Sequence, residues 1–204
     1  MVLGNMFIVI SIIIFIPVIS LYIYRKTIFN SYYTKNDIEY FSFSLKTFIE
    51  NTYPKISFKF LILEQSKSIS NIKLREEKII ENIVHQYSNF PYQVKTQKVV
   101  NKEELWSSYE VDSKPFKDKN PIDLKRRKNL AWKRAQYRCD RCGLLLRSED
   151  AKLVFAKEIT QGGTFHLENL AIVCNDCYII KQARDLNKST LELKISSILQ
   201  SRYL

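Results

Sequence analysis

Two short cysteine pairs constrain this chain more than any other feature of its sequence. Cys139 and Cys142 form one Cys-x-x-Cys turn, Cys174 and Cys177 form a second, and the chain contains no other cysteine. Each turn points two thiolates at one ion, so two turns complete a tetrahedral four-cysteine zinc site. Two disulfides or four buried free thiols are the alternatives. The pattern predicts a structural Zn²⁺ bound by these four residues.

The residues around the cysteine pairs resemble the HNH endonuclease family between about Pro121 and about Arg184. The matching features are the basic lead-in DLKRRKNLAWKRAQYRC, the first knuckle CDRCG, an apolar strand, the turn Gly162-Gly163, the phrase HLENL, the strand AIVC and the second knuckle. The resemblance implies a β-hairpin between the knuckles and a helix that begins at the second knuckle. It therefore implies a ββα-metal type zinc module and a nuclease ancestry.

The chain departs from this family at the positions that perform catalysis. The family's general base is a histidine on the first hairpin strand, but Ala156 and Lys157 stand at the aligned positions. The family's last ligand, a histidine after the second knuckle, is replaced by Tyr178. Alanine binds no metal, and a protonated lysine is a poor general base. The resemblance therefore implies impaired or lost cleavage and leaves a catalytic divalent ion without its usual ligands.

Four residues remain as weak candidates for a catalytic role, namely Asn169, His166, Lys157 and Glu158. Asn169 matches the loop asparagine of the family, whereas His166 matches a turn position rather than the base. Glu158 is the one carboxylate on the first strand. No general base emerges from this set, so the sequence leaves open whether the protein is an enzyme.

Positive charge is concentrated around the first knuckle. Between Lys114 and Arg147 the chain has twelve Lys or Arg and three Asp, a net of +9 out of +11 for the whole sequence. Such a cluster attracts phosphate, and DNA is the first expected partner. A solvated helix face and anionic lipid are the alternatives. The predicted nucleic-acid-binding residues are Arg126, Arg127, Lys133, Arg134, Arg138 and Arg141.

The start of the chain predicts a membrane anchor over residues 1–26. No charged side chain precedes Arg25, and the stretch 7–24 is almost wholly apolar. About 20 such residues cross the hydrocarbon layer. Arg25 and Lys26 then predict a single-pass protein whose C-terminal part is cytoplasmic, where thiols bind zinc more readily than they form disulfides. A cleaved signal peptide is the alternative.

For residues 34–110, the sequence predicts a small α/β region of unknown function. Hydrophobic spacing predicts a helix that Pro54 ends and a second helix over about 72–87, and apolar alternation predicts strands over 56–63 and about 94–100.

The expected fold class is therefore α+β with one transmembrane helix. The expected segments are the anchor at 1–26, the α/β region at 34–110, a polar connector at 111–120 and the zinc module with a C-terminal helix at 121–204. The sequence predicts a membrane-anchored, HNH-like zinc protein that binds nucleic acid with impaired or lost cleavage. The alternative is a structural, zinc-stapled membrane protein that binds a protein partner or anionic lipid.

Overall fold

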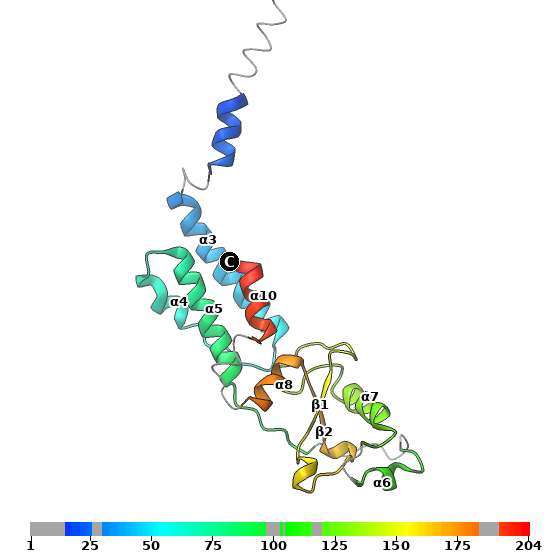
Figure 1. The fold of residues 1–204 in the computed structure, drawn as a ribbon. Helices are drawn as coiled ribbons and strands as arrows, with labels where there is room; N and C mark the ends of the chain where they lie inside the picture. Colours follow the sequence, from blue (N-terminus) through cyan, green and yellow to red (C-terminus); the bar gives the residue numbers. More distant parts are fainter. Residues whose placement is uncertain (1–14, 26–29, 97–102, 104, 116–119, 184–191) are drawn as a thin grey trace, which may run out of the picture. The chain divides into compact units, whose positions relative to one another are not determined.

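The computed structural model has two compact units, Met1–Leu45 and Lys46–Leu204. It describes residues 15–25, 30–96, 103, 105–115, 120–183 and 192–204. The fold is α+β, as expected: helices dominate the described residues, and the strands form one two-stranded sheet (Figure 1).

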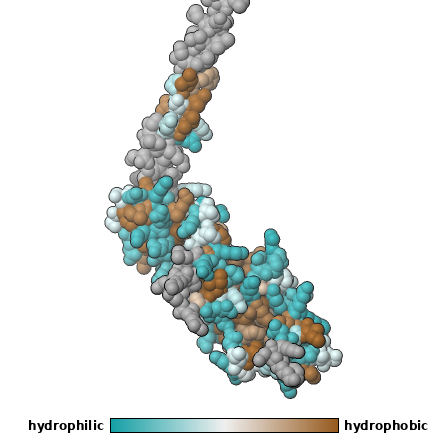
Figure 2. All heavy atoms as spheres, in the orientation of Figure 1, coloured by the Kyte–Doolittle hydropathy of each residue, from teal (hydrophilic) through white to brown (hydrophobic). Residues whose placement is uncertain are grey.

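The predicted membrane anchor is wrong. No helix among the described residues is long and apolar enough to cross a membrane. Residues 15–23 are helical and have exposed, largely apolar side chains (brown in Figure 2). At 1.5 Å per residue the described part of this helix spans about 14 Å, against a hydrocarbon layer of about 30 Å. Residues 1–14 of the predicted anchor lie outside the described residues. The predicted single-pass location with a cytoplasmic C-terminal part depended on this anchor, so it is wrong as well.

Within the unit Lys46–Leu204, α5 (Ile72–Asn89) and α10 (Lys194–Tyr203) run side by side (Figure 1). α5 confirms the helix predicted over about 72–87. The side chain of Asn71 caps it by accepting a hydrogen bond from the Leu74 N–H. The facing apolar side chains are fully buried, and they are Ile79, Ile83, Ile195 and Leu199. This helix pair forms one apolar core of the unit.

The strand predicted over 56–63 does not form. The segment is irregular and leads into α4 (Ile62–Gln65) and the 3₁₀ turn η1 (Ser66–Ser68). The Gln86 side chain accepts the Lys59 N–H at 2.7 Å and donates to the Lys59 carbonyl at 2.8 Å. A side-chain amide therefore supplies the hydrogen bonds that a neighbouring strand would have supplied. Of the other predicted strand, residues 97–100 lie outside the described residues and residues 94–96 are irregular.

The cysteine-containing region has a hairpin and two flanking helices. Its elements are α6 (Tyr109–Asp112), α7 (Leu124–Arg134), β1 (Lys152–Phe155), η3 (Ile159–Gln161), η4 (Leu167–Asn169), β2 (Leu170–Val173) and α8 (Asn175–Gln182). The strands are antiparallel, with Lys152 opposite Val173 and Phe155 opposite Leu170. α7 packs against β2 and α8 packs against β1. The described chain thus has the order strand, strand, helix between the first knuckle and Gln182.

The last helix, α10, begins without a cap of its own. Asp176, inside the second knuckle, accepts the N–H groups of Lys194 at 3.0 Å and Ile195 at 2.9 Å. A carboxylate at a helix N-terminus satisfies unpaired donors and complements the helix dipole. The second cysteine pair therefore positions α10 directly.

Candidate metal centre

The four cysteine sulfurs form one buried cluster. Cys139, Cys142, Cys174 and Cys177 are each at most 3% exposed, and their Sγ atoms all lie within 4.8 Å of one another. All four are free thiols, with 3.8 Å between the sulfurs of Cys142 and Cys174. A tetrahedron with metal–sulfur bonds of about 2.3 Å has edges of about 3.8 Å. The cluster can therefore hold one small tetrahedral metal ion.

The first knuckle requires a glycine after its second cysteine. Gly143 has φ +82°, and its N–H donates to the Cys139 carbonyl at 3.0 Å. A Cβ at this position would lie 2.9 Å from Cγ of Pro54. The left-handed backbone and the close approach both exclude a side chain here. The loop that follows α3 (Asn30–Thr52) thus packs directly on the knuckle.

Backbone and side-chain hydrogen bonds converge on the sulfurs. The Cys174 N–H donates to Cys139 Sγ at 3.3 Å, and the Cys177 N–H donates to Cys174 Sγ at 3.4 Å. The mutual hydrogen bond of Cys139 and Cys142 is the largest cause of a lowered pKa at Cys139 and a raised pKa at Cys142. Donors aimed at sulfur favour the thiolate, which is the form that binds metal.

Two further side chains reach the cluster from outside the knuckle pattern, Tyr87 in α5 and Arg141 in the first knuckle. The Tyr87 hydroxyl lies 3.3 Å from Cys177 Sγ and 3.5 Å from Cys174 Sγ. Burial raises the pKa of Tyr87, so the phenol keeps the proton that it donates. Arg141 Nη1 donates to Cys177 Sγ at 3.5 Å. Sequence reasoning missed Tyr87 because no pattern links this position to cysteines about 90 residues later.

Asp140, the residue before Arg141, joins the first knuckle to the sheet. Its carboxylate accepts the Ile172 N–H at 2.8 Å, and its own N–H donates to the Ile172 carbonyl at 2.8 Å. Burial is the largest influence on its pKa, which it raises. The residues between the cysteines thus dock other elements onto the cluster, since Asp140 holds β2 and Asp176 holds α10.

Four of the six predicted phosphate-binding residues donate guanidinium hydrogen bonds to other groups of the protein, and one of these four, Arg138, is exposed. Arg127 and Arg141 are 0% and 4% exposed. Arg134 is half-buried and donates to the carbonyls of Leu167 in η4 and Leu170 at the start of β2. Arg138 donates to the Gly143 carbonyl at 2.9 Å. Phosphate cannot reach a buried guanidinium, so Arg127 and Arg141 do not face a nucleic acid in this structure.

The other two predicted residues, Arg126 and Lys133, are exposed on the outer face of α7. They line a shallow groove together with Ile122, Asp123, Lys125, Asn129 and Leu130. The Arg126 guanidinium lies over the ring of Trp106, with 4.2 Å between the guanidinium carbon and the ring centroid. α7 contains no acidic residue. This face therefore presents three cations on one side of one helix.

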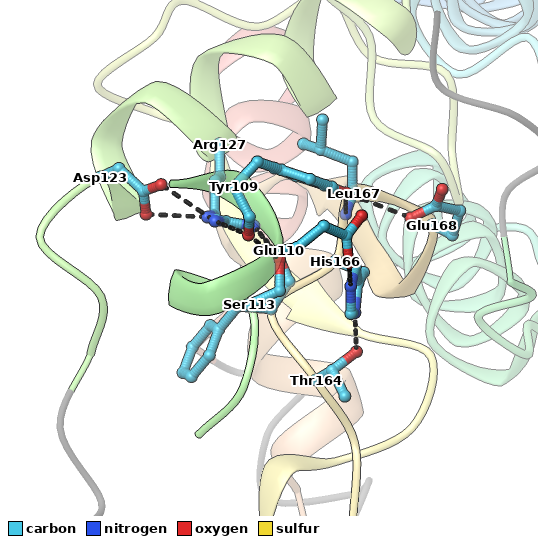
Figure 3. A network of polar contacts seen from close by, with 10 residues as sticks. Tyr109, Glu110, Ser113, Asp123, Arg127, Thr164, His166, Leu167 and Glu168 are labelled. Atoms are coloured by element: carbon cyan, nitrogen blue, oxygen red, sulfur yellow. Dashed lines mark hydrogen bonds and ion pairs between the residues drawn. The ribbon is translucent and has the colours of Figure 1, made fainter. Parts of the chain in front are cut away.

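Arg127 instead organises a buried polar network (Figure 3). Its Nε and Nη2 donate to both carboxylate oxygens of Asp123, at 2.8 and 2.9 Å. Its remaining bonds go to Ser113 Oγ at 2.7 Å, the Phe165 carbonyl at 2.8 Å and the Tyr109 carbonyl at 2.9 Å. The guanidinium therefore joins α6 to α7 and to the loop before β2.

The weak catalytic candidates His166 and Asn169 also have structural partners. His166 Nδ1 lies 2.9 Å from Thr164 Oγ1, and its Nε2 lies 3.0 Å from a carboxylate oxygen of Glu110 (Figure 3). The Asn169 side chain accepts the Lys157 N–H at 2.7 Å and donates to the Lys157 and Thr164 carbonyls. Asn169 therefore closes the loop between the strands.

A small cleft between β1 and α8 is lined by Glu158, one of the two remaining candidates. Lys181 donates to Glu158 at 2.5 Å and to the Phe155 carbonyl at 3.2 Å. The lining also includes Leu153 and Tyr178, and none of the described lining residues is a histidine. Glu158 is thus paired with a protein cation, while Lys157 is exposed.

Comparisons with protein-family models, with curated proteins and with solved structures find no match for this chain. The resemblance to HNH endonucleases therefore rests on the quoted motifs. Of the predicted site residues, the structure brings the four cysteines together, places Arg126 and Lys133 on one surface, and distributes the catalytic candidates among separate structural contacts.

Proposed function

We propose that this protein holds a structural Zn²⁺ in its four-cysteine cluster and binds nucleic acid, DNA first, without cutting it. The observation that carries the proposal is the outer face of α7, where Lys125, Arg126 and Lys133 lie exposed on a helix that contains no acidic residue. The metal cluster would stabilise the region around α7 by joining the first knuckle to the second.

Zinc is the metal that the donor set favours. Four thiolates in tetrahedral arrangement select zinc or an iron–sulfur centre, and closed four-cysteine sites are typical of structural zinc. The Tyr87 and Arg141 donors and the backbone N–H groups supply the outer hydrogen bonds that such sites use. Zinc here would hold the knuckles together and would perform no chemistry on a substrate.

Binding through three exposed cations would be electrostatic and insensitive to base sequence. Phosphate contacts by lysine and arginine release counterions, so the affinity falls steeply with salt. Three such contacts correspond to a slope of about −3 in log K against log salt on duplex DNA.

Absence of cleavage is supported by the lack of a suitable general base at the position that the resemblance assigns to it. The resemblance places the general base at Ala156 and Lys157, and the structure provides no imidazole in the cleft beside β1 among the described residues. His166, the nearest histidine in sequence, is held by Thr164 and Glu110. Loss of a general base typically costs about 10²- to 10⁴-fold in rate.

The test is a titration of full-length protein into labelled duplex DNA at several salt concentrations, followed by fluorescence anisotropy. Replacing Lys125, Arg126 and Lys133 with alanine should weaken binding and flatten the salt slope. A charge-matched control replaces the exposed lysines of the helical part, Lys59, Lys73 and Lys78, and should leave both quantities unchanged.

Two results would contradict the proposal. One is wild-type binding that does not depend on salt or on the α7 cations. The other is plasmid nicking that requires Mg²⁺ or Mn²⁺ and is lost when His166 is replaced by alanine.

A further inference from the structure

We propose that Arg141 couples metal loading of the four-cysteine cluster to the docking of helix α5, acting as a positioning residue for Cys177. This inference rests on the metal-binding part of the proposed function and is independent of nucleic-acid binding. It assigns a conformational role to a residue that the sequence had suggested for phosphate binding.

Arg141 binds the C-terminal end of α5. Its Nη2 donates to the carbonyls of Tyr87 at 2.7 Å, Ser88 at 3.1 Å and Phe90 at 2.9 Å. These carbonyls belong to the last turn and the C-cap of α5, where no intrahelical N–H remains to bind them. One guanidinium therefore satisfies the C-terminal end of a helix about 50 residues earlier in the chain, and its charge complements the helix dipole.

The buried Arg141 guanidinium has no carboxylate partner among the described residues. Arg141 is 4% exposed, yet none of the ion pairs found among the described residues includes it. Its charged contact is instead Cys177 Sγ, at 3.5 Å from Nη1. Its other contacts are neutral, namely three carbonyls and the rings of Tyr87 and Phe90, whose centroids lie 5.3 and 5.7 Å from the guanidinium carbon. Burying a cation among neutral groups is unfavourable. Among the described residues, the guanidinium thus touches the candidate metal site directly, through the sulfur of one ligand.

The four-cysteine cluster carries a net charge when a metal ion is bound. A divalent ion bound by four thiolates leaves two negative charges in excess inside the protein. The Arg141 cation offsets one of them, and the excess charge in turn compensates Arg141. When the metal leaves, Cys177 is no longer fixed in place, and the Arg141 guanidinium that contacts its sulfur is no longer held. The carbonyls of α5 then lose their donor.

Tyr87 provides a second, independent connection between α5 and the cluster. Its hydroxyl is 3.3 Å from Cys177 Sγ, and its ring packs edge-on against Tyr53 with 5.1 Å between centroids. The same turn of α5 thus contacts the cluster once through a side chain and once through Arg141. Metal loading therefore fixes the end of α5, and metal loss frees it.

The experiment uses full-length protein purified with zinc. It compares the wild type with Arg141→Met, Arg141→Lys and Tyr87→Phe by three measurements: zinc content, zinc transfer to a chromogenic chelator, and hydrogen exchange of α5. The matched control is Arg138→Met, because Arg138 also donates to a knuckle carbonyl but has no sulfur contact. Cobalt-substituted samples report the sulfur-to-metal charge-transfer band.

Arg141→Met should bind zinc but release it about 10- to 100-fold faster, the usual effect of removing an outer hydrogen bond to a metal ligand. Amides near residues 85–90 should exchange faster, while those of α7 should not change. The cobalt band should move to lower energy because the sulfur loses a donor. Arg141→Lys should rescue part of the release rate, since it restores the charge but not the planar fork. Tyr87→Phe should shift the band in the same direction.

Release rates, α5 exchange and cobalt spectra that match those of Arg138→Met would overturn the inference. If Arg141→Met does not fold, Arg141→Lys decides by the same readouts, since it keeps the charge but loses the planar fork that reaches both the carbonyls and the sulfur. A wild-type protein without stoichiometric metal would overturn the zinc proposal itself, whereas a metal-loaded protein with unresponsive variants would overturn this inference alone.

Discussion

Arg127 and Arg141 are both buried arginines next to the hairpin, but they differ in what neutralises their charge. Arg127 donates to both carboxylate oxygens of Asp123, at 2.8 and 2.9 Å. Arg141 donates to three backbone carbonyls and to the sulfur of Cys177. The counter-charge of Arg127 is therefore built into the chain, whereas that of Arg141 depends on the state of the cysteines.

This difference divides the region into a metal-independent part and a metal-dependent part. The Arg127 network joins α6 and α7 to the loop before β2 through protein groups alone (Figure 3). The Arg141 contacts join α5 to the cluster. Basic residues that look equivalent in sequence thus stabilise different interfaces and respond to different changes. The predictions below test this division in order of decreasing effect.

The largest effect is expected from Cys174→Ser, which removes one metal ligand. The variant should lose its metal and the fold of the cysteine-containing region, because apparent zinc binding contributes about 10–16 kcal/mol to small metal domains. Elemental analysis and circular dichroism measure the two losses. Cys174→His, which keeps a ligand, is the control and should retain metal. A serine variant with the metal content and melting curve of the wild type would contradict the prediction.

Arg127→Met should come next, with a loss of about 3–5 kcal/mol in unfolding free energy, because Asp123 loses its buried partner. Denaturant unfolding of the zinc-loaded protein measures this loss. The rate of zinc release from the folded variant should remain that of the wild type, in contrast to Arg141→Met. The control is Arg126→Met on the exposed side of the same helix, which should change stability little. Faster zinc release from Arg127→Met would remove the distinction between the two arginines.

The sequence predicted the cysteine cluster because metal ligation depends on local spacing. Each Cys-x-x-Cys turn brings two sulfurs together, and the structure places all four within 4.8 Å of one another. α5 was predicted for a similar reason, since its buried positions follow the helical period. Each of these two signals depends on residues that are only a few positions apart in the sequence.

The failures arose where the deciding partner is distant in sequence. The segment 56–63 has strand-like composition, but Gln86 satisfies its backbone from α5 and no strand pairs with it. Arg127 and Arg141 are charged residues in a basic run, and only their distant carbonyl and sulfur acceptors reveal that they are buried. The membrane anchor was predicted from apolar composition, which does not determine how long a helix is.

Asn169→Ala tests whether the loop between the strands belongs to the metal-independent part. The substitution should cost about 1–3 kcal/mol in unfolding free energy, because it leaves the backbone N–H and carbonyl of Lys157 without their partner. Zinc content and DNA affinity should not change. The exposed Gln161→Ala is the control for thermal denaturation. A loss of zinc from Asn169→Ala would show that the loop and the cluster depend on each other.

Glu110→Gln should have the smallest effect. It removes the charge that faces His166 at 3.0 Å, but the glutamate side chain is 75% exposed. Exposed ion pairs contribute about 0–1 kcal/mol. Thermal unfolding at pH 6 and pH 8 should therefore differ little from the wild type, and Glu149→Gln, another exposed carboxylate, is the control. A destabilisation comparable to that of Arg127→Met would place this pair inside the buried network.

The central claim is that the four cysteines bind one zinc ion and that no other residue does. X-ray absorption at the zinc edge of reduced, full-length protein tests it most directly. We predict one zinc per chain with four sulfur neighbours at about 2.3 Å. Fewer than four sulfurs, a mixture with nitrogen or oxygen ligands, or protein without stoichiometric zinc would contradict the account.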